Sequence, residues 1–282
     1  MSVAVVTDST CDLSADLAEE RGIRVVPLSV LFGDREVFSR VSVTDEEFYR
    51  QLKDADELPT TSQPVAGWFE EAWADAHDAG HEAVVSLHLS SELSGTVDRA
   101  RTLAADAPLP VTVVDSRQVS GGLALQVLAA VRAADRGGSV EEVVAAAERV
   151  REQTMSLLVV DTLSYLRRGG RLSTPEALLG AALRIRPLLG VQDGRIEMLD
   201  RERTWSRAIR RLVERAREAA GDRPQHAIIA HALAPGRAAQ VLEAVWAAVD
   251  VVDHREVVIG PVVGTHTGPG AVGVALSPAD LD

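Results

Sequence analysis

Strand-like apolar runs alternate with amphipathic helical stretches through the first half of this 282-residue chain. Valine-rich runs such as Val3–Val6 and Val84–Leu89 are each followed by a stretch with the apolar spacing of a helix. Because strands joined through helices pair in parallel, the alternation predicts a doubly wound, mostly parallel sheet. Three of the four residues in Val111–Val114 are valines, which is typical of a strand buried on both faces. A further single strand is expected at Ile23–Leu31.

The pattern changes after the amphipathic stretch that ends at Gln153. Beyond it, a helix is expected at Leu178–Leu183, and Asp193-Gly194 between two short apolar runs predicts a β-hairpin. A chain of this length suggests about two domains. We therefore expect an N-terminal α/β domain over residues 1–153 and a mixed C-terminal α/β domain over residues 154–282.

Charge and cysteine content exclude several classes of protein. A net charge of −13 and a pI near 5.0 argue against nucleic acid as the main partner. Cys11 is the only cysteine, so an internal disulfide and a cysteine metal cluster are excluded, which fits a reducing cytosol. The first residues lack a basic segment, and no apolar run approaches 18 residues. We therefore expect a cytoplasmic protein with no signal peptide and no membrane-spanning segment.

Glycines and prolines surround a single histidine near the C-terminus, in residues 260–273. Because Gly adopts backbone angles closed to other residues and Pro lacks an N–H, the segment is expected to form a rigid turn with His266 at its tip. No other His or Cys lies at ligand spacing, so we expect no metal ion there. The upstream segment Thr60–Pro64 is expected to complete the same site. In it, Ser62 is expected to cap the next helix and leave Thr61 facing the crevice.

Hydroxyl side chains follow three of the expected strands, at Asp8-Ser9-Thr10, Ser90–Thr96 and Asp115-Ser116. Ligands of doubly wound sheets lie beyond the carboxyl ends of the strands, where free helix N–H groups favour an anion. The chain has no Gly-rich phosphate loop, so a carboxylate fits better than a di- or triphosphate. Ordinary helix capping also explains each hydroxyl taken alone. The charged run Asp200–Thr204 is expected to be solvated, apart from one arginine that could turn inward.

These segments together resemble the DegV proteins, the fatty-acid-binding subunits of bacterial fatty acid kinase systems. The resemblance runs from end to end and is carried by seven stretches: Val5–Thr10, Thr61–Pro64, Leu89–Thr96, Val114–Ser116, Leu163–Ser173, Arg186-Pro187 with Asp193-Gly194, and Gly264–Gly270. The sequence departs from the pattern of the family at two places. Val65 stands where a serine is common, and Phe38-Ser39-Arg40 replaces a stretch that is often acidic.

The resemblance implies a two-domain α/β protein with a long-chain, palmitate-like fatty acid buried between the domains. Thr61 and Ser94 would hold the carboxylate with the backbone N–H near Gly95, and His266 would lie beside it. The other residues implied at the site are Arg203 and three neighbours, Ser9, Ser62 and Ser116.

The function implied is that of a carrier without a cofactor, which presents the carboxylate to a kinase subunit on another chain. An arginine cluster at Arg167, Arg168 and Arg171 would dock that subunit, pair across the domain interface or remain a solvated turn. The alternative from the residues alone is a serine hydrolase or acyltransferase that uses Ser94 or Ser9 with His266. A structural or protein-interaction module is a third class, and it would retain no lipid.

Overall fold

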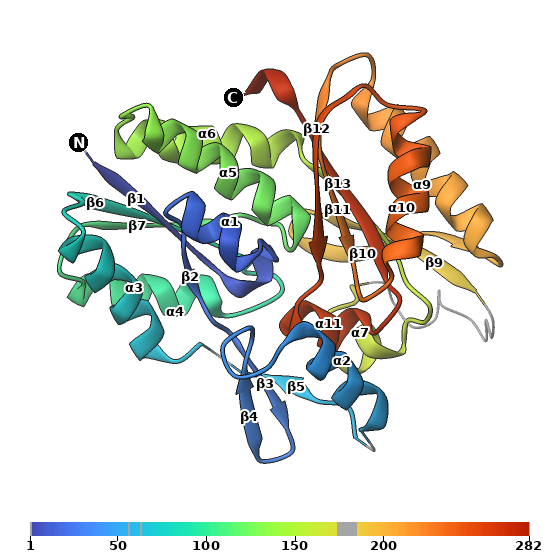
Figure 1. The fold of residues 1–282 in the computed structure, drawn as a ribbon, viewed down its shortest axis with the longest axis horizontal. Helices are drawn as coiled ribbons and strands as arrows, with labels where there is room; N and C mark the ends of the chain where they lie inside the picture. Colours follow the sequence, from blue (N-terminus) through green and yellow to red (C-terminus); the bar gives the residue numbers. More distant parts are fainter. Residues whose placement is uncertain (1, 56, 63, 174–184, 282) are drawn as a thin grey trace.

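The protein is described by a computed structural model for residues 2–55, 57–62, 64–173 and 185–281 (Figure 1). The predicted fold class is confirmed. The described residues form a parallel sheet, a mixed sheet and a small antiparallel sheet, with helices packed against the two larger ones. The helix expected at Leu178–Leu183 lies outside the described residues, as does Gln63. Within the described ranges, no helix combines the length and apolar character needed to cross a bilayer.

The first sheet is parallel, in the order β2-β1-β6-β7. It consists of β1 (Val3–Asp8), β2 (Arg24–Val26), β6 (Ala83–His88) and β7 (Val111–Asp115). Alternate side chains of its strands enter two different cores. Ala4 and Val6 pack with α3 (Ala66–Asp78) and α4 (Thr96–Leu103). Val3 and Val5 pack with α5 (Gly121–Asp135) and α6 (Val140–Gln153). The sheet is therefore covered on both faces, although the edge strand β7 is less buried than expected, with Thr112 exposed.

The single strand expected at Ile23–Leu31 is wrong. The chain leaves the first sheet after Val26 and re-forms as β3 (Ser29–Phe32), which pairs with β4 (Arg35–Phe38) and β5 (Thr60–Thr61) in an antiparallel sheet. Pro27 lies at the break, and its missing N–H cannot continue a ladder. The small sheet has a consequence for the site, because it fixes Thr61 beside Val30.

The N-terminal half also contains η2 (Ala104–Asp106), which follows α4, and three helices near its start. These three are η1 (Ser9–Cys11), α1 (Ala15–Glu20) and α2 (Asp45–Asp54). Thr44 and Glu47 form the capping box of α2, and Ser139 and Glu142 form that of α6. Each box satisfies two backbone N–H groups and so fixes where its helix begins.

The second sheet is mixed, in the order β10-β9-β8-β13-β11-β12. Its strands are β8 (Met155–Val159), β9 (Arg186–Gln192), β10 (Arg195–Glu202), β11 (Gln225–His231), β12 (Val251–Val258) and β13 (Val272–Pro278). Helices α9 (Trp205–Ala220) and α10 (Pro235–Trp246) cover one face, and α5 covers the other. The predicted hairpin joins β9 and β10, with positive φ at both Asp193 and Gly194. A short helix, α7 (Ser164–Arg168), precedes the Gly169-Gly170 turn.

The rigid turn expected around His266 is also wrong, because the segment is helical. Helix α11 (Pro261–Thr267) begins with Pro261 in its first turn and ends at Gly268, whose φ is +73°. Pro at the start and Gly just past the end are the favoured residues at these two positions. His266 therefore lies in the last turn of a short helix, which sets the direction of its ring.

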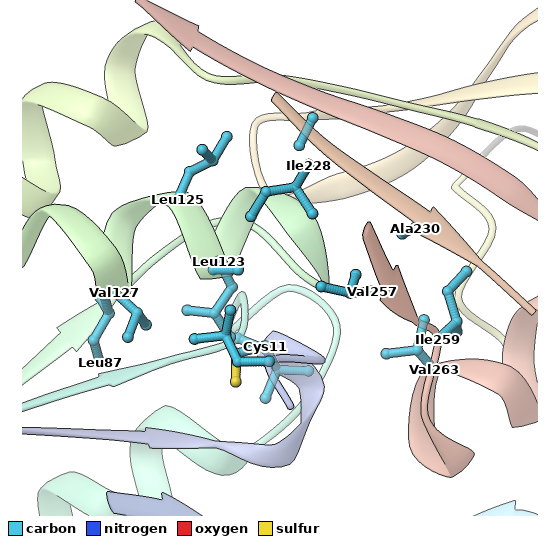
Figure 2. Packing of buried hydrophobic residues seen from close by; sticks show 14 of the residues in the cluster. Cys11, Leu87, Leu123, Leu125, Val127, Ile228, Ala230, Val257, Ile259 and Val263 are labelled. Carbon is cyan, nitrogen blue, oxygen red and sulfur yellow. The ribbon is translucent and has the colours of Figure 1, made fainter. Parts of the chain in front are cut away.

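One hydrophobic core joins the two larger sheets across α5. Leu123, Leu125 and Val127 of α5 belong to the same buried cluster as Ile228 of β11 and Val263 of α11. Figure 2 shows the α5 side chains near Leu87 of the first sheet on one side and Ile228 on the other. The space between the sheets is thus closed by aliphatic side chains, and the cavities described next are bounded by them.

Candidate functional site

A small, partly polar cavity of about 50 Å³ lies where β5, α11 and the loop after β6 meet. We call it the head cavity. Its polar walls come from segments far apart in the sequence: Thr10, Thr61, Ser62, Ser94, Arg171, His266 and Thr267. The central pair is Thr61 and His266, whose Oγ1 and Nε2 atoms lie 3.2 Å apart. The small sheet fixes one member of the pair and α11 fixes the other.

A second, apolar cavity of about 60 Å³ lies between the start of α5 and the inner face of the second sheet. We call it the tail cavity. It shares four lining residues with the head cavity: Val119, Ile196, Val263 and Thr267. The two cavities are therefore adjacent, with a polar end and an apolar end. Glycines at 121, 122, 190 and 273 contribute to the tail-cavity wall, where the absence of a Cβ lets the backbone approach closely.

A third cavity of about 330 Å³ lies on the other side of the Thr61–His266 pair, and we call it the outer cavity. Thr61, Arg171 and His266 line both the outer and the head cavity. Exposed Arg168 lines the outer cavity alone. The three shared residues thus form a thin wall that separates the head cavity from a larger space of mixed polarity.

His266 is neutral in this setting. Burial lowers the pKa of its imidazole, the nearby positive charge of Arg171 lowers it in the same direction, and the two effects together bring it to about 4. Its Nδ1 is buried and has no hydrogen-bond partner among the described residues. The ring lies against Gly169, where any side chain would collide with it. A neutral ring that donates from Nε2 to Thr61 leaves the Thr61 hydroxyl free to donate into the head cavity.

The lowered pKa of His266 makes a prediction about acid stability. Because the folded pKa is depressed below the ordinary value of 6.5, its contribution to stability is fully present above pH 6.5 and is lost as the pH falls through about 4. At pH 4 the loss amounts to about 2–3 kcal/mol. Urea unfolding of wild type and His266→Gln at pH 7.5 and pH 4 measures this. The Gln variant should lose less stability on acidification. An equal loss in both proteins would contradict the assignment.

Ser94 and Ser62 also line the head cavity, but both hydroxyls have partners within the protein. The Ser94 hydroxyl lies 2.8 Å from Oγ1 of Thr96. The Ser62 hydroxyl contacts Ser29 and Glu36, so the cap expected from Ser62 is wrong. Helix α3 instead begins after Val65 without a side-chain cap, which agrees with the departure seen at that position.

Four residues expected at the site lie outside the head cavity in the structure. The Ser9 hydroxyl accepts from the N–H of Leu28, and the Ser116 hydroxyl bonds to the backbone of Gln118. Gly95 is exposed at the start of α4, and Arg203 is exposed after β10. The cation that does line the head cavity is Arg171, which donates from Nε to the carbonyl of Leu93 at 3.2 Å. Its sequence signal is the Gly169-Gly170-Arg171 turn, and its bond to Leu93 joins the two halves of the chain, which is one of the roles expected for the arginine cluster.

A Ser–His–Asp array does occur, but not at this site. Ser86 Oγ lies 2.8 Å from His88 Nε2, and His88 Nδ1 lies 3.0 Å from Asp8 Oδ2, with all three side chains fully buried. The Asp8 carboxylate also accepts from the backbone N–H groups of Thr10 and Leu89, which both line the head cavity. None of the three side chains lines the head or the tail cavity, and the Asp8 carboxylate holds two backbone segments of the head-cavity wall. Among the described residues, no group of three or more His, Cys, Asp or Glu side chains could hold a metal ion.

Comparisons with known proteins agree with this architecture. The model of the family described as "Uncharacterised protein, DegV family" matches residues 2–279. A DegV domain-containing protein of Streptomyces coelicolor is 42% identical over 276 residues, which is 98% of each chain. A Thermus thermophilus DegV family protein, described as binding fatty acid, has a TM-score of 0.92 at 33% identity, covering 99% of this chain and 100% of that one. Bacillus subtilis DegV, described as a fatty acid binding protein, has a TM-score of 0.89 at 31% identity, covering 99% of each chain.

Proposed function

Because the chain belongs to the DegV family, we propose that it binds a long-chain fatty acid, with the carboxylate in the head cavity and the acyl chain in the tail cavity. The observation that carries the proposal is the junction of the two cavities: hydroxyls, a neutral imidazole and Arg171 line one end, and aliphatic side chains line the other. Fatty acid binding by relatives at 31% and 33% identity supports the same reading.

The two ends of such a ligand need different things from the protein. A sixteen-carbon acid has about 14 methylenes, and at roughly 0.8 kcal/mol each their burial is worth on the order of 11 kcal/mol before ordering costs. The carboxylate would be destabilised by several kcal/mol if buried without partners. Thr61 offers a hydroxyl donor and Arg171 a positive charge at the head cavity. The tail therefore supplies affinity and the head cavity supplies direction.

We assign the protein the role of a carrier because His266 is not paired with Ser94 or Ser9 at the head cavity. The structure pairs His266 with Thr61 and Ser94 with Thr96. The unpaired Nδ1 of His266 also means that no carboxylate among the described residues orients the imidazole as a base.

Extraction of bound lipid tests the proposal. The protein is purified from cells without added lipid, denatured in organic solvent and analysed by mass spectrometry for free fatty acid. We expect about one fatty acid per chain. Protein that carries no fatty acid, and takes up none from palmitate-containing vesicles, would refute fatty acid binding. Turnover of acyl esters that disappears in His266→Ala would refute the carrier role and favour the hydrolase.

The outer cavity is our candidate for the contact with a kinase subunit that phosphorylates the bound acid. It adjoins the head cavity across Thr61, Arg171 and His266, and exposed Arg168 lies at its edge. A partner that approaches there would reach the carboxylate through the shortest stretch of protein.

We expect Arg168→Glu to slow association with an ATP-dependent fatty acid kinase subunit about tenfold at low salt, since a charge at the rim of an interface acts mainly on the association rate. Fatty acid affinity should be unchanged. The matched control is Arg149→Glu, which reverses an exposed arginine on α6, away from α7 (Figure 1). Surface plasmon resonance at several salt concentrations measures both variants. Equal association rates for Arg168→Glu and wild type would remove Arg168 from the interface.

A further inference from the structure

A single buried carboxylate joins segments that form three walls of the two cavities. Asp12 follows η1 with a left-handed backbone (φ +58°) and is 1% exposed. Its Oδ1 accepts from the N–H of Gly260 at 2.9 Å, and its Oδ2 accepts from the hydroxyl of Ser120 at 2.6 Å. Gly260 is the residue before α11, and Ser120 is the residue before α5. The carboxylate therefore links the first turns of two helices that come from opposite halves of the chain.

Each linked segment contributes directly to the cavities. The turn of α5 that follows Ser120 presents Gly121 and Gly122 to the tail cavity. Helix α11 carries His266 of the head cavity. The third wall is η1 itself, because Thr10 lines the head cavity and its carbonyl accepts from the N–H of Ser120 at 2.8 Å. A shift of Asp12 would thus move polar and apolar walls together.

Two further side chains, Arg40 and Tyr49, hold the backbone near the contact between Asp12 and Gly260. Arg40 donates to the carbonyls of Leu13 at 2.8 Å and Val258 at 2.7 Å, and it pairs with Asp45. It therefore bridges the residues after Asp12 to the end of β12, two residues before Gly260. Tyr49 of α2 adds a bond to the carbonyl of Ile259 at 2.9 Å. The Arg40 segment that departs from the usual acidic pattern thus helps to anchor the start of α11.

The two bonds of Asp12 do not depend on its charge. Burial raises the pKa of its carboxyl to about 7, against the opposing effects of Arg40, Ser120 and Gly260. Oδ1 accepts from Gly260 in either protonation state, and the Ser120 hydroxyl can donate to a carboxylate or accept from a carboxylic acid. An asparagine can make the same two bonds, since its amide oxygen accepts and its amide nitrogen donates.

We propose that Asp12 is a positioning residue for the acid-binding site, which fixes the starts of α5 and α11 through its two hydrogen bonds and so sets the geometry of the head and tail cavities. This rests on the proposed function. Asp12 itself lines neither cavity and acts through Gly260 and Ser120.

The test compares Asp12→Ala with the conservative Asp12→Asn. Dissociation of cis-parinaric acid into excess lipid vesicles is followed by fluorescence. We expect the rate to rise at least tenfold in Asp12→Ala and to stay within about threefold of wild type in Asp12→Asn. Ser120→Ala, which removes one of the two bonds, should lie between them. The control is Val143→Ala on α6, which removes a buried core side chain away from the cavities and should leave the rate unchanged.

A second readout needs no fatty acid. Hydrogen exchange of the lipid-free protein should speed up over residues 260–267 in Asp12→Ala, while α9 keeps its wild-type protection. This readout also serves if Asp12→Ala retains too little ligand for a rate measurement. The proposal would be overturned if Asp12→Ala had the same ligand dissociation rate and the same hydrogen exchange as wild type. It would also be overturned if ligand dissociation from Asp12→Asn were as fast as from Asp12→Ala. Failure of wild type to bind cis-parinaric acid would instead count against the proposed function, and the exchange data would still decide the role of Asp12.

Discussion

Replacement of Ala275 by leucine is expected to weaken palmitate binding about 100-fold. Ala275 lies on β13 and lines the tail cavity beside Gly121. The added carbons would occupy space that three or four methylenes of the ligand need, and at about 0.8 kcal/mol each their exclusion costs roughly 3 kcal/mol. A short acid such as octanoate should lose much less. Titration of both acids by calorimetry measures the difference, and lipid extracted from the variant should shift towards shorter chains.

The control for this substitution is Ala227→Leu. Ala227 is buried on the opposite face of the same sheet, in the cluster formed with α9 and α10. Overpacking costs stability at either position, typically about 1–3 kcal/mol, but only the Ala275 variant should discriminate between long and short acids. Parallel losses for palmitate and octanoate in Ala275→Leu would show that the tail cavity does not hold the acyl chain.

Removal of the Thr61 hydroxyl is expected to weaken fatty acid binding by about 1–3 kcal/mol, which is roughly 5- to 150-fold. Thr61→Val keeps the shape and the strand propensity of the side chain but deletes the donor that faces the head cavity. It also leaves Nε2 of His266 without its partner. Thr60→Val is the matched control, because Thr60 is exposed on the same short strand and lines the outer cavity only. Unchanged affinity in Thr61→Val would place the carboxylate elsewhere.

Local signals in the sequence were sufficient for much of the fold. The helix that begins after Ser139 and the hairpin at Asp193-Gly194 follow from residues that touch each other within a few positions. The first sheet follows from valine-rich runs separated by helical stretches. Such short-range preferences leave a clear trace because the interacting groups are neighbours in the chain.

The strands and helices that the sequence did not predict are those whose structure is decided by long-range contacts or by a position at a sheet edge. Strand β5 is two residues long and exists only because Thr60 and Thr61 pair with β3, about 30 residues earlier. Strand β12 leaves little signal in the sequence, because its centre, Asp253 to Glu256, is mostly charged, as edge strands often are. Helix α11 could have been found, since Pro261 at its start and Gly268 after its end are a recognisable pair.

The candidate site also combines features that local sequence signals indicate with features that long-range contacts decide. The structure brings four of the predicted site residues to one cavity: Thr61, Ser62, Ser94 and His266. It could not show which hydroxyls the backbone already uses. Ser9 is occupied by the N–H of Leu28, a contact that depends on the break at Pro27. Arg171 lines the head cavity and Arg203 does not. This difference depends on the path of the chain after Gly170, which hydrophobic periodicity does not describe.

Helix α5 has a consequence for how the molecule folds. Nearly all of its residues are buried, and it contacts β1 of one sheet as well as β11 and β13 of the other. A helix that is apolar all round needs cover on every side. Residues 1–153 expressed alone would expose the Leu125 and Gly121 side of α5 to water, and residues 154–282 alone would expose the inner face of β11 and β13. We therefore expect the two sheets to unfold as one cooperative unit, so that neither half could be exchanged without the other.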